Sequence, residues 1–188
     1  MITIRQERQA DAAARDNLLD VSYGPARFAK ASERLREGRR PADALSFVAV
    51  DDGRLVGTVR LWHISLGRNR PALLLGPLAV HPDCRKRGTG SALTRRAIRE
   101  AARLGHGAVL LVGDAPYYGR FGFSAEKTGA LRLPGFCEPR RLLALELVPG
   151  ALGGVRGRVA AGSAPKPALS ERIAGRRASA PQRAMQAA

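Results

Sequence analysis

The chain has 188 residues, of which 32 are lysine or arginine and 16 are aspartate or glutamate, so its formal net charge is +16. This length fits one domain with a short tail, and a hydrophobic content of 45% is enough for a buried core. No stretch reaches 18 consecutive apolar residues, which excludes a transmembrane helix. Its two cysteines exclude a disulfide framework, and we expect a cytoplasmic protein with no membrane partner.

The positive charge does not by itself indicate nucleic-acid binding. Of the 32 basic residues 28 are arginine, and the abundance of alanine, glycine and arginine points to a bias in the coding sequence. The charge is also uneven, because residues 150–188 carry +6 of it. We predict a folded domain over residues 1–159 and a basic, disordered tail rich in Ala, Gly, Pro and Arg over residues 160–188.

The first 40 residues predict one strand and two helices. Ile2 and Ile4 alternate with polar neighbours, as in a short strand. Residues 8–21 place leucines and alanines on one side of a helix, which a Gly-Pro pair then ends. A second helix is predicted over residues 25–37, with Gly38 as its stop.

The next 40 residues predict three strands. Residues 45–50 and 55–66 form a hairpin, because the Asp-Gly sequence between them tolerates a positive φ. Residues 72–80 are a nearly continuous apolar run, which is typical of a central strand covered on both faces. Gly76-Pro77 interrupts this run, and we expect a bulge or a local parting of strands there because proline cannot donate to the ladder.

The C-terminal half adds one long helix and further strands. Residues 88–104 predict the helix, since Leu93, Ala97 and Ala101 share one of its faces. The remaining elements are expected at 108–112 (strand), 116–119 (short helix), 122–123 (start of a strand), 142–148 (strand) and 155–159 (short edge element). This order predicts an α+β fold in which helices cover both faces of a mixed central sheet.

The segment between the apolar strand and the long helix is the most informative part of the sequence. Here a strand leads through a basic, glycine-bearing loop into a helix, and the free N–H groups of such a helix start form an anion site. Arg85, Lys86 and Arg87 add positive charge, while Gly88 and Gly90 let a ligand approach the main chain. The expected anion is a pyrophosphate. A tight turn with a solvated basic surface would explain the loop alone equally well.

Two motifs carry a family resemblance. The spacing Arg85-x-x-Gly88-x-Gly90 is neither the dinucleotide fingerprint nor the P-loop, and it resembles the pyrophosphate-binding motif R/Q-x-x-G-x-G/A of the GCN5-related N-acetyltransferase (GNAT) superfamily. Residues 118–123, Tyr-Gly-Arg-Phe-Gly-Phe, resemble the second signature of that family, Y-x-x-x-G-F, and follow in the family's order. Residues 71–80 and 109–114 are similar to the branch of YhbS-like acetyltransferases. The resemblance covers residues 1–159.

The resemblance implies a GNAT-type fold and the use of acetyl-CoA as co-substrate, with no metal. In this fold the central strand parts from its neighbour, which places the pantetheine between the strands at residues 73–80 and 108–112. The backbone of Leu78, Ala79 and Val80 would then face the pantetheine. The pyrophosphate would be held by the loop and helix start, namely Arg85, Lys86, Arg87, Gly88, Thr89, Gly90 and Ser91.

The implied reaction is direct acetyl transfer to an amine of a small molecule or protein. The second signature assigns Tyr118 as the catalytic partner of the leaving thiolate, although Ala115-Pro116 departs from the expected order and Tyr117 is adjacent. A hydrogen bond from Tyr118 to the thiolate describes this role better than full proton transfer does, because a free tyrosine titrates near 10 and a thiol near 8.5. The general base stays open among His63, His81 and Asp114, each of which a structural role explains as well. The scattered histidines and cysteines predict no metal site.

Two other functions remain as alternatives, and the acceptor is not defined. The chain could be a non-catalytic acyl-CoA-binding or regulatory module, or a basic nucleic-acid-binding protein, which the charge distribution does not favour. Five arginines are expected near the acceptor-binding side of the site: Arg27, Arg34, Arg36, Arg39 and Arg40. They could attract an acidic molecule, and a solvated helix face explains them as well. Neither the acyl chain length nor the oligomeric state follows from the sequence.

Overall fold

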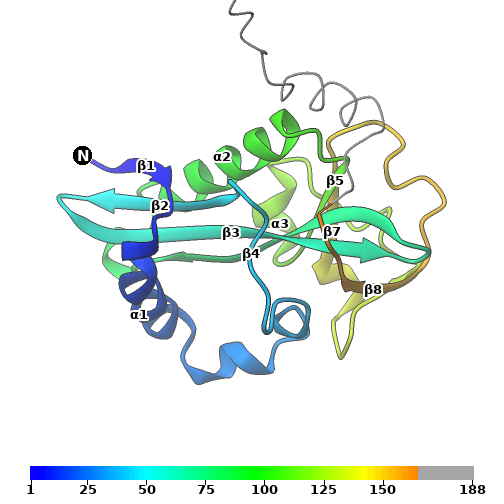
Figure 1. Cartoon of the computed structure of the whole chain (residues 1–188), viewed down its shortest axis with the longest axis horizontal. Helices are drawn as coiled ribbons and strands as arrows, with labels where there is room; N and C mark the ends of the chain where they lie inside the picture. The colour runs from blue at the N-terminus through cyan, green and yellow to red at the C-terminus, as the bar shows by residue number, and fades with distance from the viewer. Residues whose placement is uncertain (165–188) are drawn as a thin grey trace, which may run out of the picture.

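The computed structural model describes residues 1–164, without the side chains of Ala26 and Ala29, and within them the chain forms one mixed sheet with helices on both sides (Figure 1). The strands are β1 (Thr3–Gln6), β2 (Ser46–Asp51), β3 (Arg54–Leu66), β4 (Arg70–Val80), β5 (Ala108–Val112), β6 (Leu131–Arg132), β7 (Leu142–Glu146) and β8 (Gly157–Ala161). The helices are α1 (Ala12–Tyr23), α2 (Thr89–Arg103) and α3 (Ala115–Gly119). Five short 3-10 segments complete the described part: η1 (Gln9–Asp11), η2 (Pro25–Ala29), η3 (Glu33–Leu35), η4 (Pro82–Cys84) and η5 (Pro139–Arg141).

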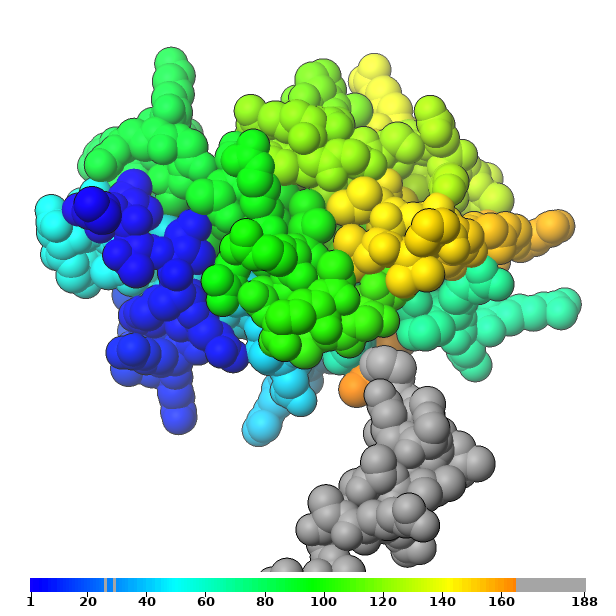
Figure 2. Space-filling model, turned by 90° about the horizontal axis from the view of Figure 1, so that it is seen from above, coloured from blue at the N-terminus to red at the C-terminus, as the bar shows by residue number. Residues whose placement is uncertain are grey.

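The sheet follows the order β1-β2-β3-β4-β5-β7, and β8 pairs with β3 and β6. Its neighbours are antiparallel except β4 with β5 and β6 with β8, which are parallel. This arrangement confirms the α+β class with a mixed central sheet. Figure 2 shows the face covered by α2, in green, which lies between the N-terminal strand in blue and the segment after β7 in yellow.

Strand β4 is buried on both faces, as its apolar sequence predicted. Leu73 and Leu75 are packed in the cluster beneath α2, with Leu93 and Ala97 of that helix. Leu74 lies in a second cluster on the opposite face. On that opposite side α1 places Leu18 and Leu19 against Ala79 near the end of β4.

The sheet parts between β4 and β5. These two strands pair only at Leu73 with Val109 and Leu74 with Leu110. Beyond that point β4 continues beside β3 as far as Val80, while β5 continues beside β7 as far as Val112. The parted ends leave a gap whose backbone groups have no strand partner across it, and such groups are available to a ligand.

The predicted bulge at Gly76-Pro77 is present. On β3, Val59 faces Leu78 and Leu61 faces Leu75, so Arg60 alone lies opposite two residues of β4. The indole Nε1 of Trp62 donates to the Gly76 carbonyl at 2.6 Å and satisfies one backbone group that the bulge releases. The bulge lies just beyond the last paired residues of β4 and β5, where the gap begins.

The predicted helix over residues 25–37 is wrong. The chain instead forms η2 and η3, and Lys30 between them has an extended backbone with φ −69° and ψ 139°. A helix needs apolar residues repeating along one face, and of the described side chains in this segment Leu35 is the buried hydrophobic one. Without a buried stripe, helix propensity alone does not hold the segment in one regular helix.

Two smaller expectations also change. The strand expected from Gly122-Phe123 is reduced to an isolated bridge between Ser124 and Ala144, because Gly122 has a φ of +87° that ends strand geometry. The edge element expected at residues 155–159 is β8, which extends to Ala161 and pairs with β3. The expected domain boundary at residue 159 therefore falls inside this strand, and residues 165–188 of the expected tail lie outside the described residues.

Candidate active site

Two cavities border the C-terminal half of β4. The first, which we call the loop cavity, measures about 390 Å³ and is lined by the end of β4, the loop after it, the start of α2, and residues of α1 and α3. The second, which we call the bulge cavity, measures about 220 Å³ and lies between α1, η2, η3 and the β4 bulge. Tyr23 and Leu78 line both cavities. The two cavities therefore meet at the gap between β4 and β5.

The loop cavity collects nine of the ten residues predicted to bind the cofactor. The missing residue is Arg87, whose Nη1 instead contacts a carboxylate oxygen of Asp51 at 3.0 Å and the sulfur of Cys84 at 3.8 Å. Arg87 thus ties the loop to the β2–β3 hairpin rather than lining the cavity. Arg85 and Lys86 line the cavity, joined by Arg120 from the segment after α3.

The start of α2 faces the loop cavity without a side-chain cap. The helix begins after Gly88, which has φ +79° and provides no side-chain hydrogen bond. The first N–H groups of an α-helix have no partner within the helix, so those of Thr89, Gly90 and Ser91 are available to a ligand. Three cationic side chains line the same cavity, so the arrangement has the charge and the free donors that an anion requires.

Gly90 makes the close approach feasible. A Cβ built at this residue would lie 2.9 Å from the hydroxyl oxygen of Tyr117 and 3.5 Å from Cγ2 of Val80. A side chain there would fill the space in front of the helix start. Lys86, in the loop before this helix, has a left-handed backbone with φ +63°.

The backbone of β4 presents alternate residues to the gap. The His81 N–H donates to the Val56 carbonyl of β3 at 2.9 Å, and backbone groups of successive strand residues point to opposite neighbours. The backbone groups of Leu78 and Val80 therefore point toward the gap, and those of Ala79 point to β3. The expectation that all three residues present their backbone to a ligand is corrected for Ala79, whose methyl group instead packs against α1.

Tyr23, the last residue of α1, is a site residue that sequence reasoning missed. Its hydroxyl donates to the Leu78 carbonyl, which is one of the groups directed into the gap. Burial raises the pKa of Tyr23, so it stays a donor at neutral pH. Its position in the sequence, next to a Gly-Pro pair, carried no signal, because only packing of α1 on the sheet brings it to β4.

Tyr117 and Tyr118 line different cavities. Tyr117 lines the loop cavity near Gly90, whereas Tyr118 lines the bulge cavity together with Val112 and Leu78. Burial raises the pKa of Tyr118 well above its ordinary value, and the neighbouring tyrosines Tyr23 and Tyr117 act in the same direction. A phenol in this setting stays protonated and can only donate a hydrogen bond or accept one.

None of the three candidate bases lines either cavity. His63 packs against the ring of His106, with ring centroids 5.6 Å apart, and lines a separate cavity with Arg39 and Arg40. His81 accepts from the Asp83 N–H at 3.4 Å in the turn after β4. Asp114 lies at the start of α3 on a further cavity beside Glu138. The acidic residues that do line the bulge cavity are Asp16 and Glu33, and both are paired with arginine.

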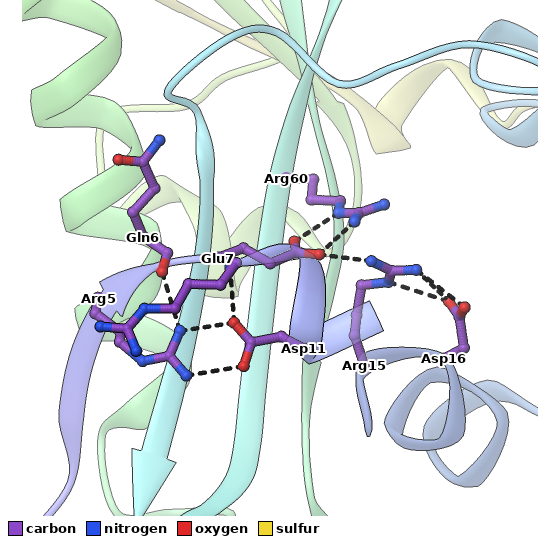
Figure 3. Close-up of polar contacts among 8 residues, drawn as sticks. Arg5, Gln6, Glu7, Asp11, Arg15, Asp16 and Arg60 are labelled. Carbon is purple, nitrogen blue, oxygen red and sulfur yellow. Dashed lines mark hydrogen bonds and ion pairs between the residues drawn. The ribbon is translucent and has the colours of Figure 1, made fainter. Parts of the chain in front are cut away.

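A buried ionic network forms one wall of the bulge cavity (Figure 3). The Glu7 carboxylate, only 6% exposed, accepts from Arg60 Nε at 2.7 Å and from Arg15 Nη1 at 2.5 Å. Arg15 also pairs with Asp16 at 2.9 Å. Two arginines and two carboxylates thus neutralise one another, which makes the network a structural wall rather than a charged binding group.

The described residues contain neither a group of metal ligands nor a membrane-spanning helix. Within residues 1–164 no three side chains of His, Cys, Asp or Glu are grouped so that they could hold a metal ion. None of the helices in this range is both long and apolar enough to cross a bilayer. The expectation of a site without metal thus stays a prediction, and the anion site remains the main feature.

An uncapped helix start beside a parted pair of parallel strands is the arrangement that the family resemblance implied, and comparison with known proteins identifies the family. Residues 42–125 match the acetyltransferase (GNAT) domain. The chain is 31% identical over 158 residues to the uncharacterized N-acetyltransferase YhbS of Escherichia coli K12, an alignment that covers 83% of this chain and 93% of that relative. The protein belongs to the GNAT acetyltransferase family, which confirms the resemblance carried by the two motifs.

Solved structures agree with this assignment. YhbS of Escherichia coli in complex with CoA superposes with a TM-score of 0.72 at 31% identity and covers 85% of this chain and 89% of its own. A GNAT family acetyltransferase of Brucella melitensis in complex with acetyl-CoA superposes with a TM-score of 0.66 at 25% identity, covering 87% and 97%. Both similarities cover a larger share of the chain than residues 42–125, which the GNAT domain matches.

Proposed function

We infer that this protein transfers the acetyl group of acetyl-CoA directly to an amine. The observation that carries this inference is the uncapped start of α2 beside the gap between β4 and β5. The N–H groups of residues 89–91, with Arg85, Lys86 and Arg120, fit a pyrophosphate in charge and in the space that Gly90 leaves. The parted strands fit an extended amide chain, and the two related structures hold CoA and acetyl-CoA.

In the proposed reaction the amine nitrogen forms a bond to the thioester carbon, and the carbon–sulfur bond then breaks. Charge that builds on the carbonyl oxygen would be held by a gap-facing N–H of Leu78 or Val80, an interaction whose loss elsewhere costs about 3–4 kcal/mol of barrier. The Tyr118 hydroxyl would donate a hydrogen bond to the departing thiolate. The amine proton leaves to water or to a base that is not assigned.

Three further assignments belong to this proposal. The acetyltransferase domain is placed at residues 1–159, extended by the last residues of β8. A cytoplasmic location fits the two cysteines Cys84 and Cys137, which are not paired with each other. The cofactor-binding set keeps the predicted loop residues, with Arg87 acting through the loop conformation.

The test combines calorimetry with mass spectrometry. Acetyl-CoA is titrated into the full chain, and a panel of amines and peptides is then incubated with both and analysed for a gain of one acetyl group. Gly90→Ala should weaken binding at least tenfold, because its Cβ occupies the space before the helix start. Gly129→Ala is the matched control, since a Cβ there meets nothing within 4 Å. An absence of heat with the folded wild-type chain would reject the proposal.

A further inference from the structure

The lining of the bulge cavity carries more basic than acidic side chains. Its lining includes five basic residues, Arg15, Arg27, Lys30, Arg36 and Arg60. Arg15 and Arg60 are paired in the network around Glu7 (Figure 3), and Arg27 pairs with Asp20 at 2.9 Å. Lys30 has no ion pair with any residue in the described part of the chain, and its ammonium group lies 4.2 Å from the centre of the Tyr23 ring.

Hydrogen bonds hold the Arg36 side chain in place through two of its three nitrogens, and the third, Nη1, has no acceptor among the described residues. Its side chain is 6% exposed, and Nε and Nη2 bond to the carbonyl and hydroxyl oxygens of Ser32, each at 3.1 Å. Nη2 also pairs with Glu33 at 2.9 Å. For Nη1 the residues at positions 1–164 provide no hydrogen-bond acceptor, and a Cβ added to Gly76 in the bulge would lie 3.7 Å from it.

The Nη1 of Arg36 is free to donate to an acceptor oxygen that enters the bulge cavity. Each terminal nitrogen of arginine carries two N–H donors, and hydrogen bonds from a charged donor to an oxyanion are among the stronger ones. Lys30 lies on the same cavity, where partial desolvation and, after it, the positive charge of Arg36 lower its pKa. An anion placed between these two groups would accept a hydrogen bond from Arg36 and offset the repulsion between the two positive charges.

We propose that the acetyl acceptor is an amine that also carries an oxyanion, a carboxylate or a phosphate, which Arg36 and Lys30 bind in the bulge cavity. This inference rests on the acetyl transfer proposed above, because it concerns the acceptor of that reaction. Anchored there, the acceptor would extend its amine past the bulge toward Leu78 and Tyr118, which line the same cavity at the gap. The cavity would then select acceptors by the oxyanion and not by the amine alone.

The test uses pairs of amines that differ only in the anion. 4-Aminobutyrate is compared with 4-aminobutanamide, and phosphoethanolamine with ethanolamine, which separates carboxylate from phosphate recognition. Two quantities are measured for each: affinity for the complex of the full chain with CoA, by calorimetry, and kcat/KM with acetyl-CoA, by mass spectrometry of the product. We expect the ionised member of at least one pair to be preferred tenfold or more in both measurements.

Variants connect that preference to the two cations. Arg36→Gln and Lys30→Gln should each reduce the preference to threefold or less, and Arg36→Lys should retain part of it. Lys30 is exposed, so its variant remains informative if Arg36→Gln fails to fold. Arg34→Gln is the matched control, because Arg34 lies in the same segment outside the cavity lining and should leave the preference unchanged.

The outcomes separate this inference from the proposed function. Equal affinity within both pairs, or a preference that survives both glutamine variants, overturns the anion site. Selective binding of the ionised amine to the CoA complex, with no acetylated product from any amine, supports the anion site and rejects acetyl transfer. If CoA itself does not bind the folded chain, both are overturned.

Discussion

At the scale of single residues, the two adjacent tyrosines of α3 line different cavities of the site. In α3 the rings of Tyr117 and Tyr118 meet edge to face, with centroids 4.8 Å apart and an interplanar angle of 81°. Gly113 provides the room for Tyr118, because a Cβ at that position would lie 2.3 Å from Cε2 of the ring. The position of Tyr118 in the bulge cavity is thus fixed by the end of β5 as well as by α3.

Tyr118→Phe tests the assigned role of the hydroxyl. We expect kcat to fall about 100-fold, because loss of a group that assists proton or charge transfer costs 10²–10⁴ in rate. The dissociation constant for acetyl-CoA should stay within threefold, since Tyr118 lines the bulge cavity and not the loop cavity. Stopped assays across pH 6–9 should show the same deficit throughout, because the raised pKa keeps the wild-type phenol protonated over that range.

Tyr117→Phe provides the comparison for this variant. Tyr117 faces Gly90 in the loop cavity, so its hydroxyl should affect acetyl-CoA affinity more than kcat. If Tyr117→Phe lost kcat and Tyr118→Phe did not, the role would belong to Tyr117. The reversed Ala115-Pro116 order would then have shifted the signature by one position.

At the scale of elements, the loop between β4 and α2 combines charge with backbone strain. Lys86 has a φ of +63°, a conformation that costs a residue with a Cβ about 1–2 kcal/mol. Lys86 lines the loop cavity, where it adds positive charge beside the helix start. Lys86 thus strains the backbone of the loop and also supplies positive charge at the proposed ligand site.

Lys86→Gly should separate these two effects. The melting temperature should rise by about 2–4 °C, corresponding to about 1 kcal/mol of relieved strain. Acetyl-CoA should bind several-fold more weakly at low salt, and the difference should shrink as ionic strength increases. Ala44→Gly is the control, because Ala44 has φ +61° away from both cavities and should raise stability without changing affinity. Unchanged affinity at low salt for Lys86→Gly would remove Lys86 from the anion site.

An ion pair anchors β1 to the start of α1. Arg5 Nη1 donates to Asp11 Oδ2 at 2.6 Å (Figure 3). The Arg8 N–H donates to the same oxygen at 2.7 Å. The Arg5 guanidinium lowers the pKa of Asp11 from 3.8 to about 2. This contact sets the position from which α1 extends Tyr23 to the end of β4.

Asp11→Asn should reveal this contact as a pH-dependent loss of stability. A lowered carboxyl pKa stabilises the fold above the unfolded pKa near 4, and this contribution is lost as pH falls toward 2. We expect the variant to be about 1 kcal/mol less stable at pH 7 after allowance for solvent screening, and equal to wild type near pH 2. Urea unfolding at several pH values measures the difference. Asp43→Asn is the control, since Asp43 forms no ion pair within residues 1–164; a pH-independent difference for Asp11→Asn would contradict the assignment.

At the scale of the whole molecule, β8 is the last strand of the described sheet. β8 pairs with β3 at Leu66 and Val159, and Val159 is 2% exposed. Removing residues 165–188, which carry a net charge of +4, should leave the melting temperature within about 2 °C and the acetyl-CoA affinity within twofold. A chain ending at Arg158 should be destabilised by about 2 kcal/mol through loss of a buried valine. If the chain of residues 1–164 lost stability or acetyl-CoA affinity, residues 165–188 would contribute to the domain that folds and binds acetyl-CoA.

The elements with strong periodicity or continuous apolar sequence were predictable. The β5 prediction matched its bounds, and β4 and α2 were placed within two residues, because burial on both faces or on one stripe leaves a clear pattern. Segment 25–37 was not predictable, since it has little buried apolar surface and is held by polar contacts such as those of Arg36. The loop cavity was largely predictable because its residues are contiguous in the chain. The bulge cavity was not, because its lining comes from α1, η2, η3, β3, β4, β5 and α3.

The sequence by itself determined the family, the anion-binding loop and the central buried strand, because each depends on residues close together in the chain. The tertiary structure alone decided which backbone groups of β4 face the gap, that Arg87 turns away to Asp51, and that Tyr23 reaches Leu78. It also decided that Arg36 is buried with a nitrogen free toward the bulge cavity. These outcomes depend on strand register and on packing between distant segments, and local sequence patterns carry neither.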